Sequence, residues 1–378
     1  MGPFWLNDGF ITKELYAPYV IERDCEYLSE LRKQYDLVLR QATRAKADPK
    51  SLEIIRRYRA EVLNALHFYY KADIEESNQI IRKLVDDVAS NDFAISELSK
   101  SWAFPGFASG ELQFYRCRTG NPTYAFSARD LLHLPEDKRS RAGSYRFSIP
   151  GNPSLYLANS SYGCWIESDC PPEIEFNVAP ILLDGTQKIL NLAVYIKDFG
   201  GLNDFATDRV HSWLKLFMLA IATSFRIKEE GRRFKSEYII SQAVMMACKK
   251  IGLDGVAYFS TRVSDAAFAR CATNLALFVE YDDMYSLLIK HMKIGNPTNY
   301  ALYKQLLPSA RGADYTLASI EHPYITNIGK YEDQHPYRET EFFEFDKYLF
   351  KRWSDSQNKI SKETVPWGFP IIQAISEN

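Results

Sequence analysis

"YRFSIPGNPSLYLANSSYGCWIE", residues 145–167, sets three chemically active side chains, Arg146, Tyr156 and Glu167, around two short apolar runs. The run that carries the tyrosine predicts a strand, and the Asn-Ser pair directly after it supplies a good helix N-cap. The glutamate then lies about two turns into that helix. A strand, a cap and a helix therefore bring Glu167 back over the end of the strand.

The Pro-Gly-Asn-Pro turn at 150–153 decides which way Arg146 and Tyr156 face. A symmetric hairpin would pair Arg146 with Leu157 and place Arg146 and Tyr156 on opposite faces. Both reach one cleft only if the turn is irregular or bulged, which this sequence permits. Each of the three side chains alone is explained by packing or a surface ion pair, so the hypothesis of a site depends on the three together.

The first hundred residues predict helices. Apolar side chains recur at three- and four-residue spacing over 28–38, 52–62 and 81–88. Pro49 stands near the start of the second helix, where its missing N–H costs little. This pattern predicts an α-helical N-terminal module over 1–104, either a packing scaffold or a partner-binding module.

Beyond this module, glycine and proline separate short β-rich runs. Strands before and after a helical middle predict an α+β fold rather than a doubly wound sheet. The sequence has no Gly-x-Gly-x-x-Gly or Walker-type loop, so a Rossmann or P-loop nucleotide site is not expected. Strands are predicted at 112–118, 154–158, 174–183, 188–194, 255–261 and 275–281, and helices at 207–225 and 236–250.

The composition of the chain indicates which broad class of protein it belongs to. The 378 residues are 46 % hydrophobic and 25 % charged with a net charge of −2, which is the balance of a globular protein without a bulk attraction to nucleic acid or anionic membrane. Six cysteines form no Cys-x-x-Cys pair, and no histidine stands at metal-ligand spacing from them, so we expect a reducing compartment and no metal. The N-terminus lacks a secretory signal, and the longest apolar run, 213–225, is too short to span a bilayer. We expect a cytoplasmic protein.

Three stretches together resemble the RES domain family. They are "FYR" at 114–116, the opening stretch, and "LDGVAYFSTR" at 253–262 followed by Asn274. The family is named for its Arg, Glu and Ser, and it occurs as the toxin of bacterial toxin–antitoxin pairs. The resemblance covers roughly 110–285.

The order and spacing of the polar residues carry this resemblance. Arg146 precedes Tyr156 by ten residues, and Tyr156 precedes Glu167 by eleven, in keeping with the family's order. The serine that looks equivalent to the family's serine is Ser260, at the end of a predicted strand, and the leading arginine is Arg116.

The resemblance implies an ADP-ribosyltransferase-like (RES) core of two small packed sheets with helices over 105–290, preceded by the α-helical N-terminal domain. Residues 291–378 are expected to form a C-terminal extension that packs on the core. The implied partners are NAD and a cognate antitoxin or regulatory protein. Self-association into a homo-oligomer stays open, and neither a membrane nor nucleic acid is expected as a partner.

NAD is implied as a substrate, consumed without a metal or a covalent protein nucleophile. Glu167 would stabilise the oxocarbenium-like centre that forms when the nicotinamide–ribose bond breaks. Arg146, together with Arg116, would bind the diphosphate through the planar guanidinium fork. Tyr156 would stack on the nicotinamide ring, and Ser260 would hydrogen-bond the substrate or orient the glutamate.

The resemblance therefore implies a RES-type toxin that depletes NAD by hydrolysis or phosphorolysis and inhibits growth, with anti-phage defence as one setting. One alternative is an ADP-ribosyltransferase that modifies a protein or a nucleic acid. Another is a non-catalytic interaction protein with a degenerate RES fold. The acceptor, the antitoxin or trigger and the role of the N-terminal helices stay open.

Overall fold

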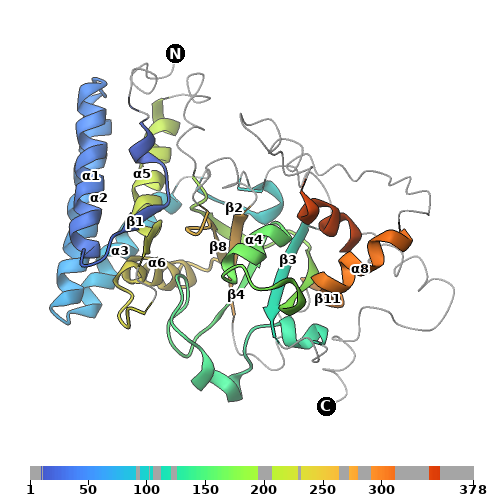
Figure 1. The fold of residues 1–378 in the computed structure, drawn as a ribbon. Coiled ribbons are helices and arrows are strands. Elements are labelled where there is room, and N and C mark those ends of the chain that lie inside the picture. Colours follow the sequence, from blue (N-terminus) through green and yellow to red (C-terminus); the bar gives the residue numbers. More distant parts are fainter. Residues whose placement is uncertain are drawn as a thin grey trace. The chain divides into compact units, whose positions relative to one another are not determined.

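The fold of the chain, drawn in Figure 1, divides into two compact units. Unit 1 comprises Met1–Ser96, Ala142–Asn152 and Lys188–Ser264, and unit 2 comprises Glu97–Arg141, Pro153–Gln187 and Asp265–Asn378. The computed structural model describes residues 10, 12–90, 94–101, 103–104, 112–120, 126–194, 207–228, 231–263, 272–279, 291–310 and 340–349.

Unit 1 is mainly helical, and its helices come from two separate parts of the chain. Helix α2 packs against both α1 and α5, and the three run side by side in Figure 1, while α3 packs against α2 and α6. Leu31, Tyr35 and Val38 of α1 point inward at the predicted spacing, so the predicted helices of the first hundred residues are confirmed. The helices are α1 (Tyr27–Arg44), α2 (Pro49–Tyr70), α3 (Ile74–Ala89), α5 (Thr207–Thr223) and α6 (Ile239–Lys250).

Buried tyrosines join α1 to α5. The hydroxyl of Tyr27 donates to the carbonyl of Ala222 at 2.6 Å, and that of Tyr35 donates to the carbonyl of Met218 at 2.8 Å. A short parallel pair of strands, β1 (Tyr19–Ile21) and β7 (Phe225–Ile227), adds to the contact. A buried hydroxyl requires an acceptor, and here the acceptors lie in the chain's middle third. Unit 1 therefore differs from the predicted module 1–104, since it includes helices beyond residue 200.

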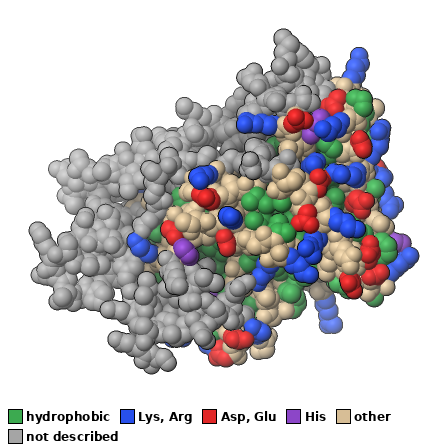
Figure 2. All heavy atoms as spheres, turned by 180° about the vertical axis from the view of Figure 1, so that it is seen from behind, with side chains coloured by type: hydrophobic (Ala, Val, Ile, Leu, Met, Phe, Trp, Pro, Cys, Tyr) green, Lys and Arg blue, Asp and Glu red, His purple; other side chains and the backbone are tan. Residues whose placement is uncertain are grey.

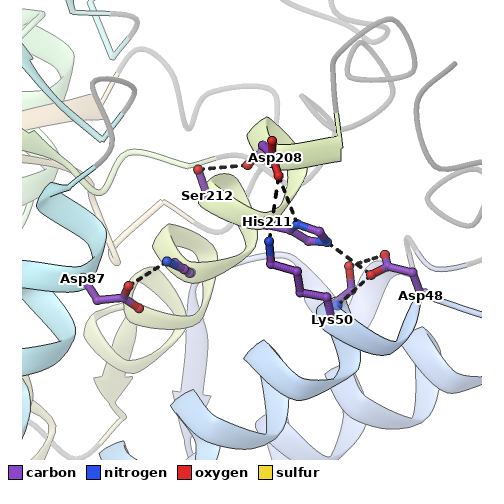
Figure 3. Close-up of polar contacts among 8 residues, drawn as sticks. Asp48, Lys50, Asp87, Asp208, His211 and Ser212 are labelled. Carbon is purple, nitrogen blue, oxygen red and sulfur yellow. Dashed lines mark hydrogen bonds and ion pairs between the residues drawn. The ribbon is translucent and has the colours of Figure 1, made fainter.

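Polar side chains tie the start of α2 to the start of α5 (Figure 3). Asp48 caps α2 by accepting from the backbone N–H of Ser51 at 2.9 Å. The Nε2 atom of His211, a buried residue of α5, lies 3.2 Å from Oδ1 of the same carboxylate. Burial raises the pKa of Asp48, but the hydrogen bonds from Ser51 and His211 outweigh this effect and lower it below its usual value.

A second ion cluster centres on Asp87 of α3, the residue that Figure 3 labels on that helix. Its carboxylate accepts from Nζ of Lys215 at 2.7 Å and from the Tyr58 hydroxyl at 2.9 Å, and it forms an ion pair with Arg57. Burial alone would raise the pKa of Asp87, but these donors lower it below its usual value. The lysine comes from α5, so the cluster links three helices of unit 1.

We expect Asp87→Ala to cost about 1–3 kcal/mol of unfolding free energy at pH 7, because Lys215 would stay partly buried without its partner. The pKa of Asp87 is lower in the folded state, so its contribution is present above the unfolded pKa of about 3.9 and is lost as the pH falls through the folded value. Urea unfolding followed by circular dichroism between pH 7 and pH 2 measures both effects. The control is Asp86→Ala, which removes only an exposed pair with Arg82; equal losses for the two variants would contradict the role given to Asp87.

The strand order of unit 1 is β8-β6-β2, and of β2 (Ile95–Glu97) the residues Ile95 and Ser96 belong to this unit. Strand β6 (Lys188–Asn191) runs parallel to β8 (Gly255–Phe259), with Ile189 opposite Gly255. Both strands lie within predicted strands. The end of β8 is important for the site because Ser260 follows it directly.

The strands of unit 2 pair edge to edge in the order β10-β5-β3-β4-β9, with β11 also on β5, and these neighbours run antiparallel. Strand β5 is buried at every position and pairs along its whole length with β3. Strand β5 also pairs with β10 and β11 on its other edge, and the expected packing of two small sheets stays a prediction. The strands are β3 (Leu112–Thr119), β4 (Ser154–Ala158), β5 (Phe176–Leu183), β9 (Thr273–Phe278), β10 (Met292–Ile294) and β11 (Thr298–Asn299).

Three helices of unit 2 pack their apolar side chains together: α4 (Ser161–Glu167), α8 (Tyr300–Ala310) and a helix at 341–349. The part of the predicted C-terminal extension at 341–349 is thus helical. The rest of the predicted C-terminal extension, 311–339 and 350–378, lies outside the described residues. The shared cluster comprises Tyr115, Ala158, Cys164, Phe176, Val178, Tyr300, Tyr303, Phe345 and Leu349.

The two units together give the mixed α+β class that the sequence predicted. None of the helices in the described ranges combines the length and the apolar character that crossing a bilayer requires.

Candidate active site

The strand and helix predicted around Tyr156 and Glu167 are present in unit 2. Strand β4 carries Tyr156, whose side chain is half-buried. Ser160 caps α4, because its hydroxyl accepts from the backbone N–H of Gly163 at 2.9 Å. Glu167 is the last residue of α4 and is exposed to solvent. The helix therefore presents a carboxylate at its C-terminal end.

The Glu167 carboxylate is held by a buried amide. The Nδ2 atom of Asn274 donates to Oε1 of Glu167 at 2.7 Å. Asn274 lies in β9 opposite Ala158 and is only 2 % exposed. Its Oδ1 atom has no hydrogen-bond partner within the ranges that the structure describes. An accessible anionic group is thus fixed by a donor that the sheet keeps in place.

Arg116 of β3 contacts the main chain that carries Tyr156. Its Nη1 atom donates to the Tyr156 carbonyl at 2.7 Å. Burial, with a smaller effect from the charge of Arg118, lowers the pKa of Arg116 to about 10. The guanidinium still carries its charge at neutral pH. Its Nε atom is buried without a partner in the described part of the chain, so the fork is only partly used.

Arg146 lies in unit 1, in an irregular turn rather than a hairpin strand. Isolated bridges join Tyr145 to Ser148 and Ile149 to Asn152, so the chain makes two tight turns in succession. Gly151 adopts a φ of +78°, which an L side chain rarely tolerates, after a proline that favours the preceding turn position. The symmetric hairpin of the sequence analysis is therefore not formed, and the irregular turn is.

The guanidinium of Arg146 is fixed by hydrogen bonds and by aromatic rings. Nη1 donates to the carbonyl of Phe259 at 2.8 Å, and Nη2 donates to the Ser224 hydroxyl at 3.4 Å. The guanidinium carbon lies 4.7 Å from the centre of the Tyr258 ring and 5.3 Å from that of Phe147. Such cation–π contacts strengthen as water is excluded, and Arg146 is only 8 % exposed.

Ser260 follows β8 and is buried, and its hydroxyl accepts from the backbone N–H of Arg262 at 3.1 Å. Arg146 binds the carbonyl of the residue before it, so the arginine holds the turn that positions this serine. The structure thus brings Arg146 and the Ser260 turn together in unit 1.

The predicted site residues fall into two groups. Arg146 and Ser260 belong to unit 1, and Arg116, Tyr156 and Glu167 belong to unit 2. Within unit 2, the arginine contacts Tyr156, while Glu167 contacts an asparagine instead. That Arg146, Tyr156 and Glu167 act in one site stays a prediction.

Sequence reasoning did not assign a role to the two rings against Arg146 or to Asn274. One signal was available in the strand alternation, because Tyr258 and Ser260 stand two residues apart and so lean to the same face. The hydrogen bond of Asn274 had no local signal, since its partner is 107 residues away in the chain.

The arrangement of potential metal ligands and of surface charges limits which ligands the described residues could bind. Within the described ranges, no three His, Cys, Asp or Glu side chains cluster as a metal site requires. On the face shown in Figure 2, lysine and arginine side chains are interspersed with aspartate and glutamate over the described surface. That part of this face offers no extended basic patch for a polyanion.

No family model matches the chain. The chain is 32 % identical over 165 residues to a protein of Bacillus subtilis (strain 168) named "Putative toxin YopC", and the match covers 40 % of this chain and 37 % of YopC. The chain therefore spans little more than a third of the length of that relative. Among solved structures, it is similar to the MbcT–MbcA toxin–antitoxin complex of M. tuberculosis with 17 % identity and a TM-score of 0.30, covering 59 % of this chain and 96 % of that one. A TM-score this low carries no weight for the fold.

We expect Arg146→Lys to lower the unfolding free energy by about 1–3 kcal/mol, because a point charge cannot keep both hydrogen bonds and the ring contacts. Chemical unfolding measures the loss, and amide exchange over 255–262 should rise because the turn after β8 loses its clamp. Arg226→Lys is the matched control, since Arg226 contacts carbonyls of the same turn only at 3.5 Å. An equal response of the two variants would show that the Arg146 contacts do not hold this turn.

Proposed function

We propose that this chain is a toxin of the RES type that consumes NAD by cleaving its nicotinamide–ribose bond. The observation that carries the proposal is the accessible Glu167 carboxylate, oriented by the buried Asn274 amide at 2.7 Å. It has support from the family resemblance of the sequence and from the similarity to a relative that is named as a toxin.

The proposed chemistry matches what this carboxylate can do. Loss of nicotinamide leaves positive charge on the ribose carbon and ring oxygen, and a fixed anion close to them lowers the barrier. Because Asn274 already orients Glu167, little reorganisation is needed as the charge develops. Nicotinamide leaves with the bonding electrons, and water or phosphate then bonds to the ribose carbon and loses a proton to the medium.

The arginines have two proposed tasks. Within the described residues, the Nε donor of Arg116 has no partner, and we assign it to a diphosphate oxygen of the substrate. Arg146 already donates to a backbone carbonyl, so its proposed task combines binding of the diphosphate with holding the Ser260 turn. Tyr156 would stack on nicotinamide, and Ser260 would donate a hydrogen bond to the substrate.

An enzyme that depletes NAD must be restrained in the cell that makes it. By resemblance to RES toxins, we propose that a cognate antitoxin or regulatory protein does so and that the reaction takes place in the cytoplasm. Growth inhibition would then follow release from that partner.

Glu167→Gln should abolish NAD loss while leaving the fold intact. The glutamine amide oxygen can still accept from Asn274, so the variant removes the negative charge and keeps the side-chain position. NAD turnover by the purified proteins is the measurement, with a drop of about 100-fold or more expected, and circular dichroism checks the fold. Glu173→Gln, at an exposed surface pair with Lys304, is the control. Turnover by Glu167→Gln at the parental rate would refute the role of the carboxylate.

The exposure of Glu167 favours a second candidate, transfer of ADP-ribose to a macromolecule, since a large acceptor can approach an exposed carboxylate. Incubation with adenine-labelled NAD and a cell lysate separates the two. We expect free labelled ADP-ribose or its phosphate. Label that stays on protein or nucleic acid, and is lost with Glu167→Gln, would identify a transferase instead.

A further inference from the structure

We propose that Asp346, in the helix at 341–349, is a positioning residue that holds α4 and thereby places the Glu167 carboxylate. The inference rests on the proposed function, because it assigns Asp346 a part in the same reaction. All the groups involved belong to unit 2.

The contact itself is between a side chain and the main chain. The carboxylate oxygens of Asp346 lie 3.1 and 3.5 Å from the backbone nitrogen of Ser161, the first residue of α4. The first N–H groups of a helix have no acceptor within the helix. Ser160 supplies an acceptor for Gly163, and Asp346 supplies the one for Ser161. The start of α4 is thus held by its own cap and by a segment far away in the chain.

The burial of Asp346 indicates that its carboxylate is present for its hydrogen bond to α4 and not for packing. The residue is only 2 % exposed, and its helical neighbours Phe345 and Leu349 belong to the apolar cluster. Burial and the charge of Asp346 together raise the pKa of the nearby Tyr115 hydroxyl. A buried carboxylate costs free energy unless it is hydrogen-bonded, and an apolar side chain of similar size would avoid that cost. Packing alone therefore does not explain an acid at this position.

Further contacts join the same helix to the side of α4. The Ser161 hydroxyl donates to the Phe342 carbonyl at 3.4 Å. The ring of Phe342 lies 5.4 Å from that of Trp165 and 5.5 Å from that of Tyr162. Beyond the other end of α4, the Ser168 hydroxyl and Sγ of Cys117 lie 2.9 Å apart. Every turn of this short helix is fixed by another element.

The length of α4 makes these contacts decisive for Glu167. The helix has 7 residues, too few to be stable by its own hydrogen bonds. Its rise of 1.5 Å per residue puts Glu167 about 9 Å along the axis from Ser161. A small tilt at the start therefore moves the carboxylate by about 1 Å, a displacement that can cost about 100-fold in rate.

Asp346→Leu and Asp346→Asn test the inference in the full chain. The leucine variant should lose about 100-fold in kcat with KM for NAD changed about twofold at most, because the carboxylate is displaced while the substrate contacts remain. The asparagine variant should recover most of kcat, since its amide oxygen can still accept from Ser161. The melting temperature of the leucine variant should fall less than that of Leu349→Ala, because removal of a buried charge partly offsets the loss of the acceptor for the Ser161 N–H.

Leu349→Ala is the matched control, since it opens a cavity in the same helix without touching the main chain of α4. It should lower the melting temperature and leave kcat of the folded protein unchanged. Parental kcat in Asp346→Leu would overturn the inference, as would an equal kcat loss in Leu349→Ala.

Amide exchange of residues 161–167 separates failure of this inference from failure of the proposed function. Exchange should rise in Asp346→Leu and not in Asp346→Asn. If the parental protein leaves NAD intact, the proposed function fails, and unchanged exchange in Asp346→Leu would independently overturn the positioning role.

Discussion

The hydrogen bond from Asn274 to Glu167 is the interaction on which the functional interpretation depends. It joins β9 to the end of α4 and gives an exposed carboxylate one orientation. The amide is buried and lies opposite Ala158 in the sheet, so the strand pairing that builds unit 2 also places the donor. A carboxylate on an isolated seven-residue helix would have no such constraint. The sheet, the cap at Ser160 and the helix at 341–349 all act on the same short element.

In unit 1, neighbouring groups likewise hold a cationic side chain in one orientation. Arg146 sits in an irregular turn, and a carbonyl, a hydroxyl and two rings fix its guanidinium. Because the carbonyl belongs to the residue before Ser260, the arginine and the serine turn form one structural element. The helices α1 to α3 contribute to this unit through tyrosine hydroxyls and an ion cluster with α5.

Local sequence patterns predicted most elements but not how they combine. The helical spacing before residue 90, the strand at 154–158 and the cap before α4 are visible in the sequence because each depends on neighbouring residues. The short strand β1 was not predicted, since three residues form a strand only when β7 lies beside them. The division into units and the Asn274 and Asp346 contacts depend on residues more than a hundred positions apart. No local pattern encodes such pairs. The candidate residues could thus be named from the sequence, but not the partners that orient them.

The most direct test of NAD cleavage at the nicotinamide–ribose bond is product analysis of NAD incubated with the purified protein, freed of any bound partner. Chromatography should show nicotinamide released in a one-to-one ratio to the NAD lost, together with ADP-ribose or its phosphorylated form. NAD that stays intact, or that yields AMP through cleavage of the diphosphate, would contradict the proposed chemistry.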